Sequence, residues 1–168
     1  MTITRLAAAE DIAPAAAVHI ESCLDIYRGI APDHIVDGPM RPNLEALWAA
    51  ETLPGDDFMV VAEEAGEILG LVVARLGEEF GDDPYVEHFH VRPELKGRGI
   101  GRMIFNLLVS ELQARGRGRF HLHVAHGNDG ARDFYLALGG VVSEAIEGDL
   151  FGYPHASNVI RWPDLAAL

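Results

Sequence analysis

The stretch that most constrains this chain is "ELKGRGIGR", residues 94–102, in which three glycines alternate with other residues between basic side chains. It follows the apolar stretch 85–91, which predicts a strand, and leads into 99–114, whose apolar face predicts a helix packed on a sheet. Glycines let backbone N–H groups approach a ligand closely, and a helix N-terminus attracts negative charge. This order of strand, glycine loop and helix predicts a binding site for a phosphate-bearing ligand.

Two nucleotide-binding loops are excluded by single positions in this stretch. A nucleoside-triphosphate loop needs Gly-Lys followed by Ser or Thr, but here Lys96 precedes the glycines and no Ser or Thr follows them. A dinucleotide-binding loop needs a third glycine at position 102, which is Arg102. We therefore expect the loop to bind phosphate in another structural context.

Basic residues are concentrated around the same loop in an otherwise acidic chain. The net charge is −13, yet residues 92–119 hold seven basic side chains against two acids. So acidic a chain argues against nucleic acid as a partner, because nucleic-acid binding depends on Lys and Arg neutralising phosphates. The concentration indicates either one small anionic ligand or a helix with solvated charged ends.

Periodicity predicts a mixed α/β protein. No repeat, low-complexity tract or linker divides the chain, so we expect a single domain over residues 1–168. A helical crossover between two strands implies that those strands are parallel. Stretch 27–42, rich in proline and glycine, is expected to be an irregular connection, and Asn43 the cap of the helix after it. Helices are predicted at 10–23, 43–53, 99–114 and 128–140, and strands at 2–7, 58–64, 67–76, 85–91, 119–125, 141–146 and 157–162.

Cysteine content and the first residues give an expectation about location. The single cysteine, Cys23, excludes internal disulfides, and residues 1–14 lack the basic-then-apolar pattern of a secretory signal. No apolar run approaches the roughly 18 residues that span a bilayer. We therefore expect a cytoplasmic protein that does not contact membranes.

Two stretches carry a resemblance to a known family. "HVRPELKGRGIG" resembles the pyrophosphate loop of the GCN5-related N-acetyltransferases, the GNAT superfamily, with Lys96 where the family usually has Gln or Arg. "LHVAHGNDGARDFYLALGG" resembles the family's second motif at the usual distance, and "VVAEEAGEILGLVV" its hairpin. The resemblance implies an α/β (α+β) GNAT fold, with a central mixed, twisted sheet of six to seven strands. About four helices would flank this sheet, which would be splayed between its fourth and fifth strands.

The same resemblance implies that acetyl-CoA is the cosubstrate. Backbone groups of Phe89 and Val91 would bond to its pantetheine arm, and the glycine loop would hold its pyrophosphate. Asn128 matches a position that often contacts the arm, although a plain helix cap is the alternative role. The expected coenzyme A-binding residues are Phe89, His90, Val91, Lys96, Gly97, Arg98, Gly99, Ile100, Gly101, Arg102, Asn128 and Tyr135.

Acetyl transfer to an amine would need a base and a proton donor. An amine with a pKa near 10.4 costs roughly 4.6 kcal/mol to deprotonate at pH 7, which a positioned base makes accessible. Tyr135 matches the family tyrosine that protonates the leaving sulfur; a core aromatic is its alternative role. Glu87 matches a position where the family has bases, and an ordered water chain is the alternative. Strand alternation places Glu87 on one face with Tyr85, Phe89 and Val91, and places Val86, His88 and His90 on the other.

Three further expectations concern metals, the acceptor and other functions. Histidines two positions apart, at 88 and 90 and at 121 and 123, have a spacing that suits a metal site, but the family needs no metal and we expect none. The acids of loop 78–83 would attract a cationic amine or form a solvated loop. The resemblance implies an amine on a small-molecule acceptor and leaves a homodimer open. A non-catalytic acyl-CoA-binding regulatory module remains the alternative, as does an acyltransferase using another acyl chain or a hydroxyl acceptor.

Overall fold

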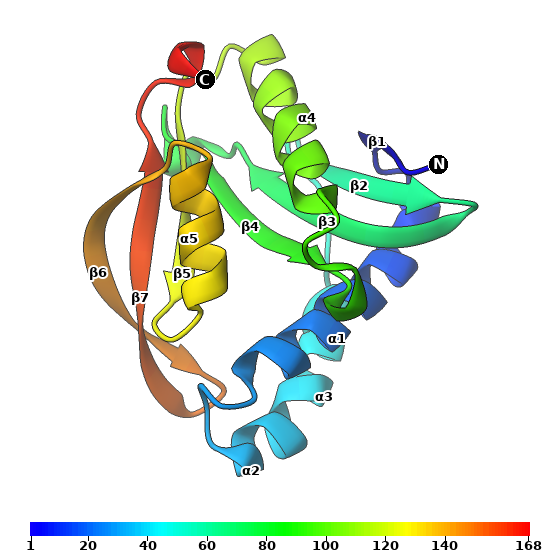
Figure 1. Cartoon of the computed structure of the whole chain (residues 1–168), viewed down its shortest axis with the longest axis vertical. Helices are drawn as coiled ribbons and strands as arrows, with labels where there is room; N and C mark the ends of the chain where they lie inside the picture. Colours follow the sequence, from blue (N-terminus) through cyan, green and yellow to red (C-terminus); the bar gives the residue numbers. More distant parts are fainter.

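A seven-stranded sheet runs through the computed structural model, which describes residues 1–168 (Figure 1). The spatial order of the strands is β1-β2-β3-β4-β5-β7-β6, and only the β4–β5 pair is parallel. The strands are β1 (Ile3–Leu6), β2 (Phe58–Glu64), β3 (Glu67–Arg75), β4 (Tyr85–Val91), β5 (Phe120–Ala125), β6 (Val141–Leu150) and β7 (Tyr153–Trp162). The helices are α1 (Ile12–Tyr27), α2 (Asp33–Ile35), α3 (Arg41–Ala49), α4 (Ile100–Ala114) and α5 (Asp129–Ala137). This mixed sheet, flanked by four longer helices, confirms the expected GNAT fold.

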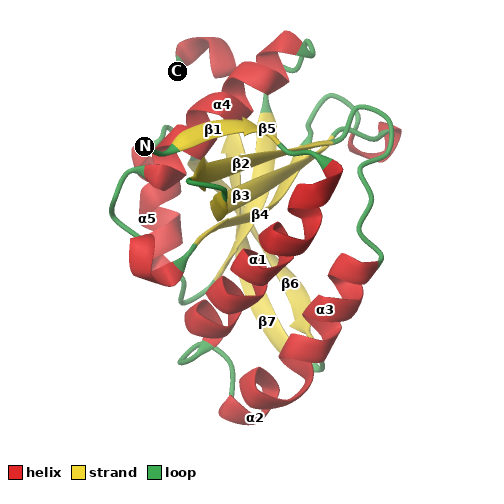
Figure 2. Ribbon diagram, turned by 90° about the vertical axis from the view of Figure 1, so that its right-hand side faces the viewer, coloured by secondary structure: helices red, strands yellow, loops and turns green.

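Two apolar clusters form the core, one on each face of the sheet. Strand β2 contributes to both, because Val60 faces the cluster under α4 and α5, whereas its neighbour Val61 faces the cluster under α1 and α3. Figure 2 shows α1 crossing the sheet on one side and α4 lying on the other. A central strand buried on both faces has no polar side, which explains why "FMVVA" is a continuous apolar run. No helix is both long and apolar enough to cross a membrane.

The parallel strands separate soon after they meet. Strands β4 and β5 pair only at Tyr85–His121 and Val86–Leu122, whereas β5 pairs with β7 along its whole length. The β5-facing edge of β4 beyond Val86 therefore has no strand partner, and its peptide groups remain available to a ligand. This opening is the expected splay between the fourth and fifth strands.

The expectation of an irregular connection over stretch 27–42 holds for residues 28–32 but was wrong for residues 33–42. The chain forms α2 and then a π-helical turn at Val36–Met40 before α3 begins at Arg41. Val36 and Met40 are fully buried against α1, so tertiary burial stabilises helical structure despite Gly38 and Pro39. Asn43 consequently lies inside α3 and does not cap it.

The predicted alternation along β4 was wrong for Val86 and Glu87, although Phe89 and Val91 share one face and His88 and His90 the other, as expected. His88 has φ +53°, and the β3–β4 register shifts beside it, so a bulge interrupts the alternation. Glu87 and His88 both lie toward α1 and α3, together with His90. Phe89 instead packs against the opposite cluster, where Val86 and Val91 also lie. The bulge thus separates Glu87 from the phenylalanine predicted to share its face.

Candidate active site

Two cavities meet where β4 and β5 separate. The first, of about 500 Å³, lies along the glycine loop and the start of α4, and we call it the loop-side cavity. The second, of about 220 Å³, lies between α1, β4 and β5, and we call it the α1-side cavity. Six residues line both: Ile26, Phe89, His90, Asn128, Ala131 and Tyr135. A ligand in one cavity can therefore reach a ligand in the other.

The glycines of the loop serve two different purposes. Gly97 and Gly99 have φ near +80°, a left-handed conformation that other residues adopt only with strain, and Gly99 is the cap of α4. Gly101 has ordinary backbone geometry, but a Cβ there would lie 3.1 Å from the Phe134 ring. The first residues of α4 line the loop-side cavity, so the N-terminus of this helix is in position to bind an anion there.

Side-chain charge in the loop-side cavity is entirely positive. Lys96 and Arg102 are the only charged residues that line it. The Lys96 ammonium also lies 2.9 Å from the Asp25 carboxylate, which links the loop to α1. This cavity has the charge and backbone geometry that a pyrophosphate needs, so the residues present fit coenzyme A.

Eleven of the twelve residues expected to bind coenzyme A line the loop-side cavity. The exception is Arg98, which lines a separate cavity beside Thr2 and Glu64. Asn128 is placed for either of its two expected roles, helix cap or ligand contact. Its Oδ1 accepts a hydrogen bond from Ala131 N at 3.4 Å, and the residue also lines both cavities. Its capping role and a ligand contact are therefore compatible.

Glu87 lines the α1-side cavity, and Arg75 holds its carboxylate in place. Its Oε1 accepts a hydrogen bond from Arg75 Nε at 2.6 Å. Arg75 also pairs with Glu51 at 2.6 Å and with Asp57 at 3.3 Å, so three carboxylates share one guanidinium. This network fixes the position of Glu87.

Tyr135 stands at the junction of the two cavities. Its ring lies 5.9 Å from that of Phe89 and 6.0 Å from that of Trp162, which holds it in the core. Burial raises the pKa of its phenol above the usual range, so the hydroxyl keeps its proton at neutral pH. Tyr135 thus lines both cavities and carries a neutral phenol.

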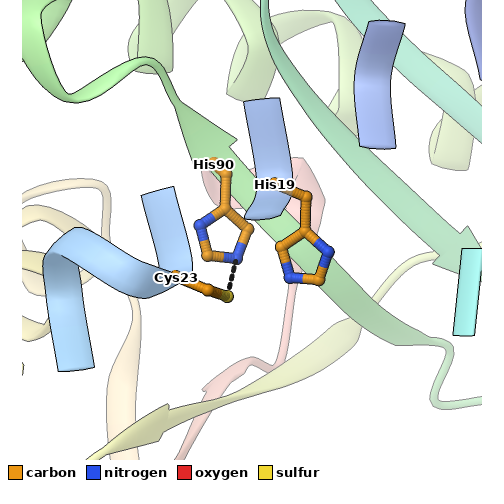
Figure 3. Close-up of side chains that lie close together, drawn as sticks. All are labelled: His19, Cys23 and His90. Carbon is orange, nitrogen blue, oxygen red and sulfur yellow. Dashed lines mark hydrogen bonds between the residues drawn. The ribbon is translucent and has the colours of Figure 1, made fainter. Parts of the chain in front are cut away.

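A histidine cluster lines the α1 side and includes a possible metal triad. One donor atom from each of His19, Cys23 and His90 lies within 4.8 Å of the others. However, Trp48 Nε1 donates a hydrogen bond to His19 Nδ1 at 2.7 Å, so the proton of the neutral ring is on Nε2. Figure 3 shows that this edge of the ring points toward Cys23 and His90. A protonated nitrogen has no lone pair for a metal, so this contact argues against a metal at the triad.

The two histidine pairs do not assemble one site. His88 and His90 face α1, where their rings lie 4.4 and 4.5 Å from His19. His121 and His123 flank Tyr85 on the β5 side, at 5.4 and 4.9 Å. None of the acids of loop 78–83 lines either cavity, and Asp83 pairs with Arg161. The acidic group beside the α1-side cavity is the Arg75 network instead.

The buried histidines predict a loss of stability in acid. Burial lowers the pKa of His19 to about 3 and that of His88 to about 4, from 6.5. Between these values the unfolded chain binds protons that the folded chain does not, so stability decreases as pH falls from about 6.5. Each of the two histidines should lower the free energy of unfolding by about 2 kcal/mol at pH 5 relative to pH 8, as measured by urea unfolding.

A pair of variants isolates this histidine effect. His88→Asn removes one titrating ring and suits the positive φ, because asparagine tolerates that conformation. Between pH 8 and pH 5 the free energy of unfolding of this variant should fall by about 2 kcal/mol less than that of the wild type. His34→Asn, at an exposed position, should leave the wild-type dependence unchanged. Equal slopes for His88→Asn and the wild type would contradict the assignment.

Comparison with known proteins agrees with this geometry. The family model described as "Acetyltransferase (GNAT) family" matches residues 20–139, which contain the glycine loop, β4, β5 and the second half of α1. The chain belongs to the GNAT acetyltransferase family. This membership supports acetyl transfer as the general chemistry of the site.

Individual GNAT relatives are distant. Mycothiol acetyltransferase from Paenarthrobacter aurescens (strain TC1) is 28% identical over 110 residues, covering 63% of this chain and 34% of that protein. The chain spans about a third or less of the curated relatives it matches. The PaiA N-acetyltransferase of Thermoplasma acidophilum, solved with coenzyme A, has a TM-score of 0.74 and 18% identity, covering 94% of this chain and 98% of that one. The acetyltransferase yncA of Salmonella typhimurium, solved with acetyl-CoA, has a TM-score of 0.71 and 18% identity, covering 98% and 94%. These structures share the fold.

The sequence did not predict two sets of contacts beside the α1-side cavity, the carboxylates around Arg75 and the hydrogen bond from Trp48 to His19. Arg75 ends β3, and nothing in its sequence neighbourhood indicates that three carboxylates converge on it. The contact of Trp48 with His19 joins α3 to α1 and has no sequence pattern either. His19 and Cys23 are four positions apart, so their shared helix face was the one available signal.

Proposed function

We propose that this chain transfers the acetyl group of acetyl-CoA to an amine of a small-molecule acceptor, by direct attack in a ternary complex. The observation that carries the proposal is the junction of the two cavities between splayed parallel strands. On one side lie the glycine loop, Lys96 and Arg102, which suit a pyrophosphate. On the other lies a smaller cavity with a carboxylate in its wall, which suits an amine. Tyr135 lines both.

The proposed reaction uses one residue from each side of the junction. The lone pair of the neutral amine attacks the thioester carbonyl carbon, forming the C–N bond and breaking the C–S bond. Glu87 receives the proton that the ammonium must lose, directly or through water. Tyr135 gives a proton to the departing thiolate, and its phenolate regains a proton, directly or through water, from the nitrogen, which loses its second proton as the amide forms. The buried, protonated phenol supports this role. The unpaired edge of β4 beyond Val86 supports binding of the extended pantetheine arm.

A free-thiol assay over a panel of amines tests the proposal. Purified protein with acetyl-CoA should release coenzyme A only when a suitable amine is present, and mass spectrometry should find the amine heavier by one acetyl group. The same assay with propionyl-CoA tests transfer of a longer acyl chain, and with hydroxyl-bearing acceptors it tests transfer to oxygen. Binding of acetyl-CoA without transfer to any acceptor would favour a regulatory module instead.

Replacing Glu87 tests the proposed base. Glu87→Gln should lower kcat by about 100-fold at pH 7, within the range that a general base contributes. The deficit should shrink as pH approaches 9.5, because the amine then loses its proton to solvent more readily. The measurement is a pH profile of kcat for both proteins.

Glu51→Gln provides the matched control for this prediction. Glu51 also binds Arg75 but does not line the α1-side cavity. It should therefore retain kcat within a few fold and the wild-type pH profile. An equal loss in Glu51→Gln would assign the effect to the position of Arg75 instead of to proton transfer.

A further inference from the structure

The two cavities have opposite charge. The loop-side cavity is lined by Lys96 and Arg102 and by no acid. None of the 17 residues lining the α1-side cavity is a lysine or arginine, and Glu87 is its only carboxylate. The junction thus separates a region suited to an anion from a region suited to a cation.

The other titratable groups of the α1-side cavity are neutral. Burial lowers the pKa of His19 to about 3 and that of His88 to about 4, and it lowers the pKa of His90 and His123 as well. Burial also raises the pKa of Tyr27, Tyr85 and Cys23 to about 12. At neutral pH these imidazoles, phenols and the thiol add no charge that would compensate Glu87.

The ion pairs behind the cavity wall also have an excess of acid. Arg75 is shared by Glu87, Glu51 and Asp57. On the β5 side, Arg161 is shared by Asp83 and Glu144. Carboxylates outnumber guanidiniums in both groups, so neither offers a free positive charge to a ligand.

Aromatic side chains also line the α1-side cavity, alongside aliphatic ones such as Leu122 and Val124. Tyr85 lies 4.9 Å from His123, and Tyr27 packs edge-on to His155 at 6.3 Å. Ring faces combined with a carboxylate attract ammonium groups. A carboxylate on the ligand would instead lie near Glu87 without a cationic partner, which is unfavourable in a partly desolvated cavity.

We propose that the α1-side cavity selects acceptors that are small cationic amines lacking a carboxylate beside the reacting nitrogen. This inference rests on the acetyl transfer proposed above and specifies its acceptor class. Amino acids and other acceptors with an α-carboxylate should be excluded by charge. The volume of about 220 Å³ limits the acceptor to a compact molecule.

Matched pairs of compounds test this selection, because each pair differs only by the carboxylate. Suitable pairs are tyramine and tyrosine, histamine and histidine, and putrescine and ornithine. Calorimetry on protein loaded with coenzyme A measures binding, and thiol release from acetyl-CoA measures transfer. In at least one pair the amine should bind at least 30-fold more tightly and have at least 30-fold higher kcat/KM. Equal or better binding of the amino acids across all pairs would overturn the inference.

A charge-adding variant tests the electrostatic cause. His123 lines the cavity and is partly exposed to solvent, so a lysine ammonium at this position would keep contact with water. His123→Lys should improve binding of the amino acid relative to its amine by at least fivefold. His123→Gln controls for loss of the imidazole and should keep the wild-type preference. An unchanged preference in His123→Lys would overturn the electrostatic explanation and the inference with it.

The two readouts separate this inference from the proposed function. Tighter binding of the amines with no thiol release would support the selection and contradict acetyl transfer. Thiol release that is faster with the amino acids would support acetyl transfer and overturn the selection.

Discussion

Replacing Tyr135 with phenylalanine is expected to lower kcat by about 100-fold or more while leaving the Kd for acetyl-CoA within about threefold. A general acid contributes about 10² to 10⁴ to a rate, and phenylalanine cannot donate a proton to the leaving thiolate. The ring contacts with Phe89 and Trp162 do not involve the hydroxyl, so the packing should survive. Steady-state kinetics and calorimetry measure the two quantities.

Tyr27→Phe is the matched control for this experiment. Tyr27 is partly buried and lines the α1-side cavity, and its phenol has a pKa of about 12, but it does not line the loop-side cavity. Removing the Tyr27 hydroxyl should therefore change kcat by only a few fold. A wild-type kcat in Tyr135→Phe would make Tyr135 a core aromatic with no part in proton transfer.

The local patterns that predicted the fold are those that burial imposes on a chain. Strand β2 is apolar on both faces, and α4 has an apolar face, because each packs against a core cluster. Strand β6 lacks such a pattern, since nearly all of it is exposed, and it was predicted four residues too short. Its length depends on pairing with β7, and neither strand's own side chains reveal that pairing.

The predicted site divides in the same way. The glycine loop and the helix of Tyr135 are local motifs, so their positions could be anticipated from residues 90–102 and 128–140. Which side chains of β4 share a face could not all be predicted, because the bulge at His88 depends on the register with β3. Convergence of Glu51, Asp57 and Glu87 on Arg75 joins three separate segments, and only the folded chain brings them together.

Gly99→Glu is expected to weaken acetyl-CoA binding by more than 100-fold. Gly99 has φ +81°, so any side chain there strains the backbone, and it caps α4, whose first residues line the loop-side cavity. A carboxylate ~5 Å from one pyrophosphate charge is repelled by about 3 kcal/mol at an effective dielectric of about 20. That energy alone is a factor of about 100 in Kd, measured by calorimetry.

Gly99→Gln separates the charge from the strain in this prediction. Glutamine has nearly the same shape as glutamate and imposes the same backbone conformation, but it carries no charge. It should weaken binding by about tenfold, so that the two variants differ by at least tenfold at low salt. The difference should narrow at high salt, because ions screen the repulsion at this exposed loop. Equal affinities for the two variants would show that pyrophosphate does not bind at the start of α4, and wild-type affinity in Gly99→Glu would exclude the loop from coenzyme A binding altogether.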